Sequence, residues 1–105
     1  MAPKRLSITI AIFLSHILLM LGCGYPEVSP KTYECAKALY SVCNQKDIHR
    51  LDIVEQLISE GEAEESLRPA ESQWLREIVA TARSGEWTDA AAEARQILDD
   101  QIVEH

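Results

Sequence analysis

Two cysteines and one histidine in the first half of the chain are residue types that bind metals. Cys35, Cys43 and His49 follow one another with seven and then five residues between them. Structural zinc sites usually pair cysteines only about two to four residues apart, so this spacing is not typical of a metal site. We therefore predict no metal site. A ligand or metal pocket that uses these three side chains remains an alternative.

Pairs of carboxylates are the other residues that could do chemistry. Asp52 with Glu55, and Glu71 with Glu77, are pairs that could face one another, but an acidic helix always offers such pairs, and they usually form a solvated face. The chain has no Gly-rich phosphate loop, no Gly-x-Ser-x-Gly turn and no CxxCH haem attachment. Catalysis needs a nucleophile or a metal, a base and a group that orients them. We predict no catalytic residue, no cofactor and no enzymatic activity.

A third cysteine, Cys23, stands at the end of an apolar segment. Lys4 and Arg5 precede the run 6–21, whose 16 residues are mostly apolar. A basic start, an apolar run and a small residue form a secretory signal. The run is shorter than the roughly 20 residues that span a bilayer, and His16 inside it is costly in hydrocarbon. These features predict a cleaved signal peptide over residues 1–22.

The four residues Met20-Leu21-Gly22-Cys23 resemble the lipobox of bacterial lipoproteins. The resemblance covers residues 1–23, and Met20 departs from it because the family most often has Leu there. It implies cleavage between Gly22 and Cys23, a diacylglycerol on the Cys23 sulfur and an acyl chain such as palmitate on the new amine. Several acyl chains give the stable anchoring that one chain does not. Two alternatives are an ordinary signal peptide cut further on and an uncleaved N-terminal anchor.

The expected mature chain is strongly acidic. Residues 23–105 are 83 residues that hold all 17 acids and eight of the ten Lys and Arg, so their net charge is −9. Such a chain lacks the basic face that nucleic-acid binding needs. By the lipoprotein resemblance, Gly24 rather than Asp after the cysteine favours the outer membrane, facing the periplasm. We expect residues 23–29 to be a short tether and residues 30–105 to be one small domain.

A disulfide between Cys35 and Cys43 is not expected within one copy. Eight residues along one helix separate them by about 12 Å, whereas a disulfide needs Cα atoms about 4.4–6.8 Å apart. We predict that both thiols are buried as small apolar residues. An intermolecular disulfide is the alternative.

The domain is predicted to be all-α, a small antiparallel bundle of about four helices in two hairpins. Ala, Leu, Glu, Gln and Arg dominate, and β-branched alternation is missing. Helix starts are expected at Ser29-Pro30, at Asp47 and at Pro69, and Gly85 is expected to end the third helix. The expected helices are 29–43, 48–60, 69–84 and 86–103.

Apolar residues recur at helical spacing in each expected helix. Trp74 and Trp87 are the bulkiest of them, and we expect both to fill the core. The acidic run 61–66 is predicted to be a solvated loop rather than a calcium site, because Glu62, Glu64 and Glu65 lack the ligand spacing of a calcium loop. The predicted apolar faces are Tyr33, Ala36, Leu39, Tyr40, Val42 and Cys43; Leu51, Val54, Leu57 and Ile58; Trp74, Leu75, Ile78, Val79 and Ala82; and Trp87, Ala90, Ala91, Ala94, Ile97, Leu98 and Ile102.

The segment 71–101 is similar to a tetratricopeptide-type helical hairpin. Gly85, Glu86, Trp87 and Ala90 correspond to the family's glycine, acidic residue, aromatic and downstream alanine. The resemblance implies an antiparallel hairpin of two helices. About three such repeats are needed for a stable array, so it does not imply a peptide-binding groove here.

Taken together, the sequence predicts a small lipid-anchored envelope protein that acts as a protein–protein interaction or structural module. Its partner is expected to be an envelope protein or a second copy of the chain, with the membrane contacted through the lipid anchor and no nucleic acid bound. An exposed apolar patch is expected at Tyr25, Tyr33, Tyr40 and the Ile102-Val103 tail. The alternative is a periplasmic ligand- or metal-binding lipoprotein with a pocket between the helical hairpins.

Overall fold

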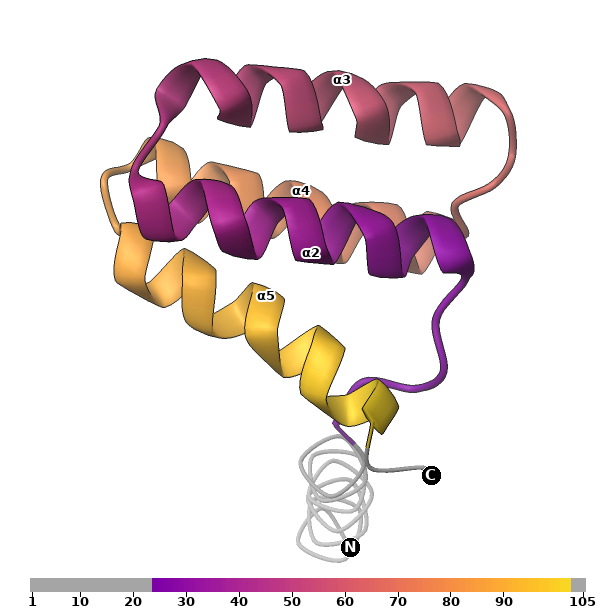
Figure 1. Cartoon of the computed structure of the whole chain (residues 1–105). Helices are drawn as coiled ribbons and strands as arrows, with labels where there is room; N and C mark the ends of the chain where they lie inside the picture. Colours follow the sequence, from indigo (N-terminus) through magenta and orange to yellow (C-terminus); the bar gives the residue numbers. More distant parts are fainter. Residues whose placement is uncertain (1–23, 103–105) are drawn as a thin grey trace, which may run out of the picture.

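The computed structural model describes residues 24–102, which form four α-helices and no strand (Figure 1). The predicted all-α fold is therefore confirmed. The helices are α2 (Pro30–Gln45), α3 (Ile48–Ala63), α4 (Pro69–Arg83) and α5 (Trp87–Ile102). Over residues 24–102, none of these helices is both long enough and apolar enough to cross a membrane.

The ends of α2 and α3 are set by the residues that the sequence indicated. The Ser29 hydroxyl accepts a hydrogen bond from the Thr32 N–H at 3.3 Å, and Pro30 occupies the first helical position. Lys46 takes a left-handed conformation with φ 53° and ends α2. One residue later, the Asp47 carboxylate caps α3 by accepting from two backbone N–H groups of its first turn.

The helix ends of the second hairpin are likewise set by residues close to them in sequence. Pro69 begins α4, and a three-residue link, 84–86, turns the chain into α5. Gly85 adopts φ +90°, a conformation that costs other residues about 1 kcal/mol or more, and its N–H donates to the Ala82 carbonyl. The short link makes α4 and α5 antiparallel neighbours, as predicted.

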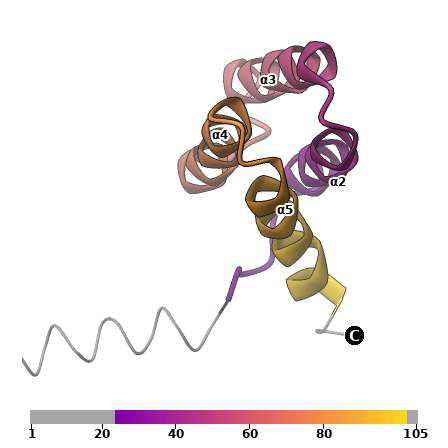
Figure 2. The ribbon, with the colours of Figure 1, turned by 90° about the vertical axis from the view of Figure 1, so that its left-hand side faces the viewer.

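The two hairpins join mainly through the first and last helices. The most extensive helix–helix packing is between α2 and α5, which are far apart in sequence. Viewed end-on, α2 and α4 lie between the outer helices α3 and α5 (Figure 2). Within the described chain, α3 packs on α2 and α4 but does not contact α5. One side of α3 is therefore left without a neighbouring helix.

The core is aliphatic, and the expectation that tryptophans fill it is wrong. Trp74 and Trp87 are only half-buried: Trp87 packs against the edge of the core, and the ring of Trp74 meets that of Tyr25. Tyr33 and Tyr40 are likewise half-buried. The largest fully buried apolar side chains are Leu39, Leu51, Ile58, Leu75, Ile78 and Ile97.

The acidic run 61–66 is only partly a loop, which corrects the prediction. Helix α3 continues to Ala63, so Glu62 is helical and faces α4. Its carboxylate accepts two hydrogen bonds from Arg76, at 2.5 and 2.9 Å, and one from Ser72. These bonds lower the pKa of Glu62 to about 2. The side chain of Leu67 packs directly against the backbone of Gly61, where a larger residue would have no room for its Cβ atom.

Candidate functional site

Several predicted features lie outside the described residues. They are the signal peptide 1–22, its cleavage site at Gly22 and Cys23, the lipidated sulfur of Cys23, and Val103 of the predicted C-terminal patch. Of Ile102, the backbone alone is described, as the last residue of α5.

The segment that follows the predicted anchor contacts the helical domain directly. The Tyr25 N–H donates to Asp100 at 2.7 Å, and the Val28 N–H donates to the Gln101 side chain at 3.1 Å. The Tyr25 ring meets the ring of Trp74 edge-on, with centroids 5.0 Å apart. Residues 24–29, which we expected to be a tether, therefore lie along α5 and reach α4.

The two cysteines and the histidine are not brought together. Cys35 and Cys43 are free thiols buried in the core on α2, as predicted, and burial raises the pKa of both. His49 is exposed in the first turn of α3. Among residues 24–102, no group of three or more His, Cys, Asp or Glu side chains has a metal-binding arrangement.

The two carboxylate pairs have structural partners. Asp52 and Glu55 both accept hydrogen bonds from Arg83, at 2.7 and 2.6 Å, which joins α3 to α4. Glu71 does not face Glu77 and is not on a solvated face, which corrects that interpretation: it is 2% exposed. It accepts hydrogen bonds from the Ser29 N–H, the Ser29 hydroxyl and the Arg68 N–H.

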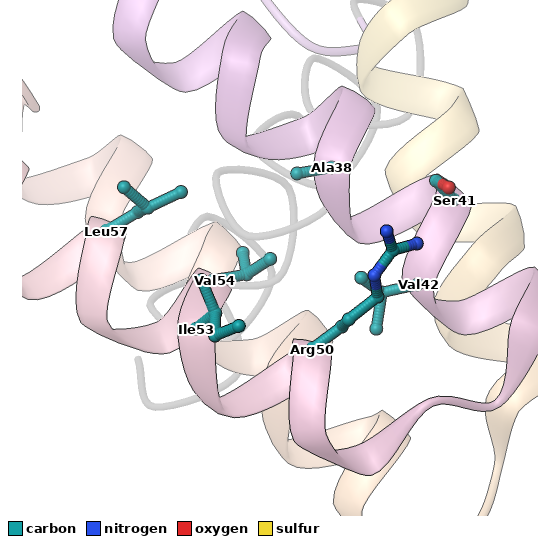
Figure 3. A pocket seen from close by; sticks show the side chains of 7 residues that line it. All are labelled: Ala38, Ser41, Val42, Arg50, Ile53, Val54 and Leu57. Atoms are coloured by element: carbon teal, nitrogen blue, oxygen red, sulfur yellow. The ribbon is translucent and has the colours of Figure 1, made fainter.

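A groove of about 400 Å³ runs between α2 and α3 (Figure 3). Its walls are mainly aliphatic, and its α2 side carries the small side chains of Ala38 and Ser41. Ile53 of α3 is 59% exposed, the highest exposure of any large apolar side chain in residues 24–102. The full lining is Ala38, Ser41, Val42, Arg50, Ile53, Val54 and Leu57.

Arg50 is the only charged side chain in this lining. Its guanidinium donates to the Gln45 side chain at 3.0 Å, and it forms no ion pair within residues 24–102. In Figure 3 the guanidinium extends from α3 toward α2 at one end of the groove. The site is thus an apolar channel with an unpaired positive charge at one end.

A second cleft, of about 480 Å³, lies between α2 and α5 and so between the two hairpins. Tyr33, Lys37, Tyr40 and Arg95 all contribute to its lining. The Lys37 ammonium lies 5.9 Å from the centre of the Tyr33 ring, and Arg95 donates to the Tyr40 hydroxyl at 3.4 Å. Asp99, also in the lining, pairs with Arg95 at 3.4 Å, so Lys37 is the one base of the cleft without an ion pair within residues 24–102.

The expected patch of tyrosines is not the most exposed apolar surface. Tyr25, Tyr33 and Tyr40 are all half-buried, whereas Ile53 projects beside the α2–α3 groove. The sequence does carry a signal for this site. Ile53 lies four residues before Leu57, so the two share a side of α3, although the predicted apolar face of this helix included Leu57 and not Ile53.

No known protein family, no curated protein and no solved structure matches this chain.

Proposed function

We propose that this chain is a lipid-anchored protein of the bacterial envelope whose helical domain is a protein-interaction module. The observation that carries the interaction role is the exposed Ile53 beside an apolar groove, on a helix with one side free of neighbours. Covering an isoleucine side chain contributes about 1.5–3 kcal/mol, which favours a partner at this place. The lipobox resemblance at residues 20–23 supports the anchor.

The contacts of residues 24–29 suit an anchored domain. If Cys23 carries the acyl chains, the hydrogen bonds of Tyr25 and Val28 to the end of α5 start only two residues later. The domain then stays within a few ångströms of the headgroups, because one residue spans at most about 3.6 Å. In Figure 1, α3 lies on the side of the bundle away from the start of the segment that leads into α2, so an anchor at Cys23 leaves the groove open. Its partner is an envelope component or a second envelope-anchored chain.

The anchor is tested by the intact mass of the membrane-bound protein beside a Cys23→Ser variant. We expect the mass of residues 23–105 plus acyl groups, and we expect the variant to lose the acyl groups and leave the membrane fraction. Cys43→Ser is the matched control, because its thiol is buried in α2 and its loss leaves the anchor in place. A mass equal to the whole chain, or a soluble product without Cys23, contradicts the proposal.

The interaction role is tested by placing a photo-crosslinking residue at position 53 in cells, with position 77 on the exposed face of α4 as the control. We expect crosslinks from position 53 to an envelope protein and few from position 77. Crosslinks to a cytosolic protein alone, or equal weak labelling from both positions, contradict it.

A second function is favoured by the cleft between α2 and α5. Lys37 there forms no ion pair within residues 24–102, whereas Arg95 is paired with Asp99 of the same lining at 3.4 Å. A small anionic molecule held by Lys37 fits this charge, with Tyr33 and Tyr40 as stacking surfaces. Thermal unfolding with and without phosphate or glucuronate tests this, beside Lys37→Gln. A rise in the unfolding temperature that Lys37→Gln removes supports the ligand, and no rise with either anion contradicts it. Added zinc is the test for the alternative that uses the thiols and His49.

A further inference from the structure

The face of α3 that borders the α2–α3 groove carries a stripe of side chains whose pattern is complementary to itself. Arg50, Ile53, Leu57 and Glu60 are spaced by three, four and three residues along α3, and helical geometry puts them in one stripe. The stripe has a base at one end, two aliphatic residues in the middle and an acid at the other end. Read in the opposite direction, the spacing is the same and the charges are exchanged.

The two charged ends of the stripe are open. Arg50 and Glu60 are both exposed, and neither forms an ion pair within the described residues. The acids on the other side of α3, Asp52 and Glu55, are held by Arg83. The stripe therefore keeps one unpaired charge of each sign, which sets the polarity of any helix that packs on it.

From this pattern we propose that the groove binds a second copy of this chain, in an isologous dimer with the two α3 helices antiparallel. This orientation places Arg50 opposite Glu60 of the second copy and Ile53 opposite Leu57 of the second copy, each contact occurring twice. Ile53 and Leu57 are four residues apart, a spacing by which apolar side chains of one helix pack against a second helix. Ala38 and Ser41 are small, so the second α3 can settle between α2 and α3.

The contact is a modest one, which fits an anchored protein. A seam of two aliphatic residues with an ion pair at each end lies at the small end of protein interfaces, so affinity in dilute solution is weak. Two copies held on one membrane have a much higher effective concentration. The inference rests on the interaction role proposed above for the groove, and it does not depend on the lipid anchor.

Charge reversal tests the dimer on the full chain as purified from membranes in detergent, by sedimentation over a range of protein concentrations. Arg50→Glu places two acids together at each end, and Glu60→Arg places two bases together. We expect each change to weaken the dimer at least about tenfold, and the double exchange to restore it to within about threefold. Lys37→Glu and Glu77→Arg, both outside the groove, are the matched controls and leave the dimer unchanged.

A second variant separates interface loss from unfolding. Ile53→Asp removes the exposed aliphatic group, and we expect it to leave the protein monomeric, with helical circular dichroism and an unfolding temperature like those of the wild type. A wild-type protein that stays monomeric at every concentration overturns the dimer. A dimer that both single reversals leave intact, or that the double exchange does not restore, overturns this geometry.

Different results overturn the dimer and the anchored interaction module proposed above. A monomeric wild-type chain that still crosslinks an envelope protein through position 53 overturns the dimer alone, because the groove then has another occupant. A Cys23→Ser variant whose mass differs from the wild type only by the replaced atom, and which stays in the same fraction, overturns the anchor. The charge-reversal result still decides the dimer.

Discussion

Glu71 shows how one buried carboxylate connects two helices. It accepts hydrogen bonds from Ser29, the cap of α2, and from the N–H of Arg68, the residue before α4. It also lies in the first turn of α4, where the helix dipole favours a negative charge. Burial by itself raises the pKa of Glu71, and the hydrogen bonds from Ser29 and Arg68 outweigh this effect, so that the pKa lies below its ordinary value.

We predict that Glu71→Gln lowers the free energy of unfolding by about 1–3 kcal/mol, because an amide cannot accept from all three donors without placing its own N–H groups beside them. Urea unfolding followed by circular dichroism measures this. Glu77→Gln, on the exposed face of the same helix, is the control and is expected to change stability by less than about 0.5 kcal/mol. Equal stability of the two variants contradicts the structural role of Glu71.

Acid is expected to destabilise the protein through Glu71 and Glu62. Because folding lowers the pKa of both groups, their contribution to stability is complete above the unfolded value of 4.5. It is lost as the pH falls through the folded pKa, which for Glu62 is about 2. Thermal unfolding is measured between about pH 7 and about pH 2, the range of acid denaturation. The unfolding temperature should fall more steeply with pH for the wild type than for Glu62→Gln/Glu71→Gln. Parallel curves contradict this prediction.

The buried thiols give a prediction about reactivity. Cys35 and Cys43 are in the core, and burial raises the pKa of each, so the reactive thiolate is rare and shielded in the folded state. We expect the native protein to react with a thiol reagent at least about a hundredfold more slowly than the same protein in denaturant. Fast native labelling, or a disulfide between them found by mass spectrometry, contradicts it.

At the scale of the elements, α3 and α5 each contact two other helices. On α3, the contacts to α4 and the contacts to α2 are of different kinds. Arg83 and Arg76 join it to α4 through ion pairs, while its side toward α2 is apolar and partly open. The helix is thus fixed on one side and available on the other, which is the arrangement that an interaction surface needs.

The end of α3 depends on close packing at Gly61. A methyl group added there would lie 2.8 Å from the Leu67 side chain, closer than real contacts allow. Replacing a helical glycine by alanine normally stabilises by about 1 kcal/mol, but overpacking costs about 1–3 kcal/mol. We predict that Gly61→Ala lowers the free energy of unfolding.

A double-mutant cycle with Leu67→Ala checks the cause. If the clash is responsible, Gly61→Ala should be neutral or stabilising in the Leu67→Ala background, because the overlapping side chain is gone. A cost of Gly61→Ala that is the same in both backgrounds would contradict the clash.

At the scale of the whole molecule, the first described residues close the bundle onto its last helix. Gly24 approaches Asp100 so closely that an added methyl group would lie 2.9 Å from the carboxylate, and Gln101 contacts both Val28 and the Pro26 carbonyl. Both ends of the described chain therefore lie together, beside the predicted anchor. Helix α3, which forms one wall of the α2–α3 groove, lies on the other side of the bundle (Figure 1).

This closure predicts slow hydrogen exchange in the backbone near the predicted anchor. The Tyr25 N–H donates to Asp100 and the Val28 N–H donates to Gln101, so both amides are protected while the segment lies on α5. We expect Asp100→Ala/Gln101→Ala to speed exchange in the peptide that contains Tyr25 and Val28 at least about tenfold, because the segment loses these hydrogen bonds and opens more often. Asp99→Ala, whose side chain pairs with Arg95 at the surface, is the control. Equally fast exchange in the wild type would contradict the closure.

The sequence by itself determined the local features of this protein. Ser29, Pro30, Asp47, Pro69 and Gly85 mark helix ends through interactions with residues only a few positions away, so the four helices were predictable with their starts. The thiols were expected to be buried for the same reason, since helical periodicity places them on the apolar face of α2.

Tertiary structure decided which parts of those helices meet. The partner of Glu71 is 42 residues away in sequence, and Tyr25 is 75 residues from Asp100, so no local pattern indicates either contact. The same holds for Trp74, whose ring meets that of Tyr25. Ile53 is outside the apolar face predicted for α3, and the packing of α2 and α4 on that face decided that Ile53 remains 59% exposed. Local signals arise from neighbours along the chain, whereas burial is set by the neighbours that folding brings together.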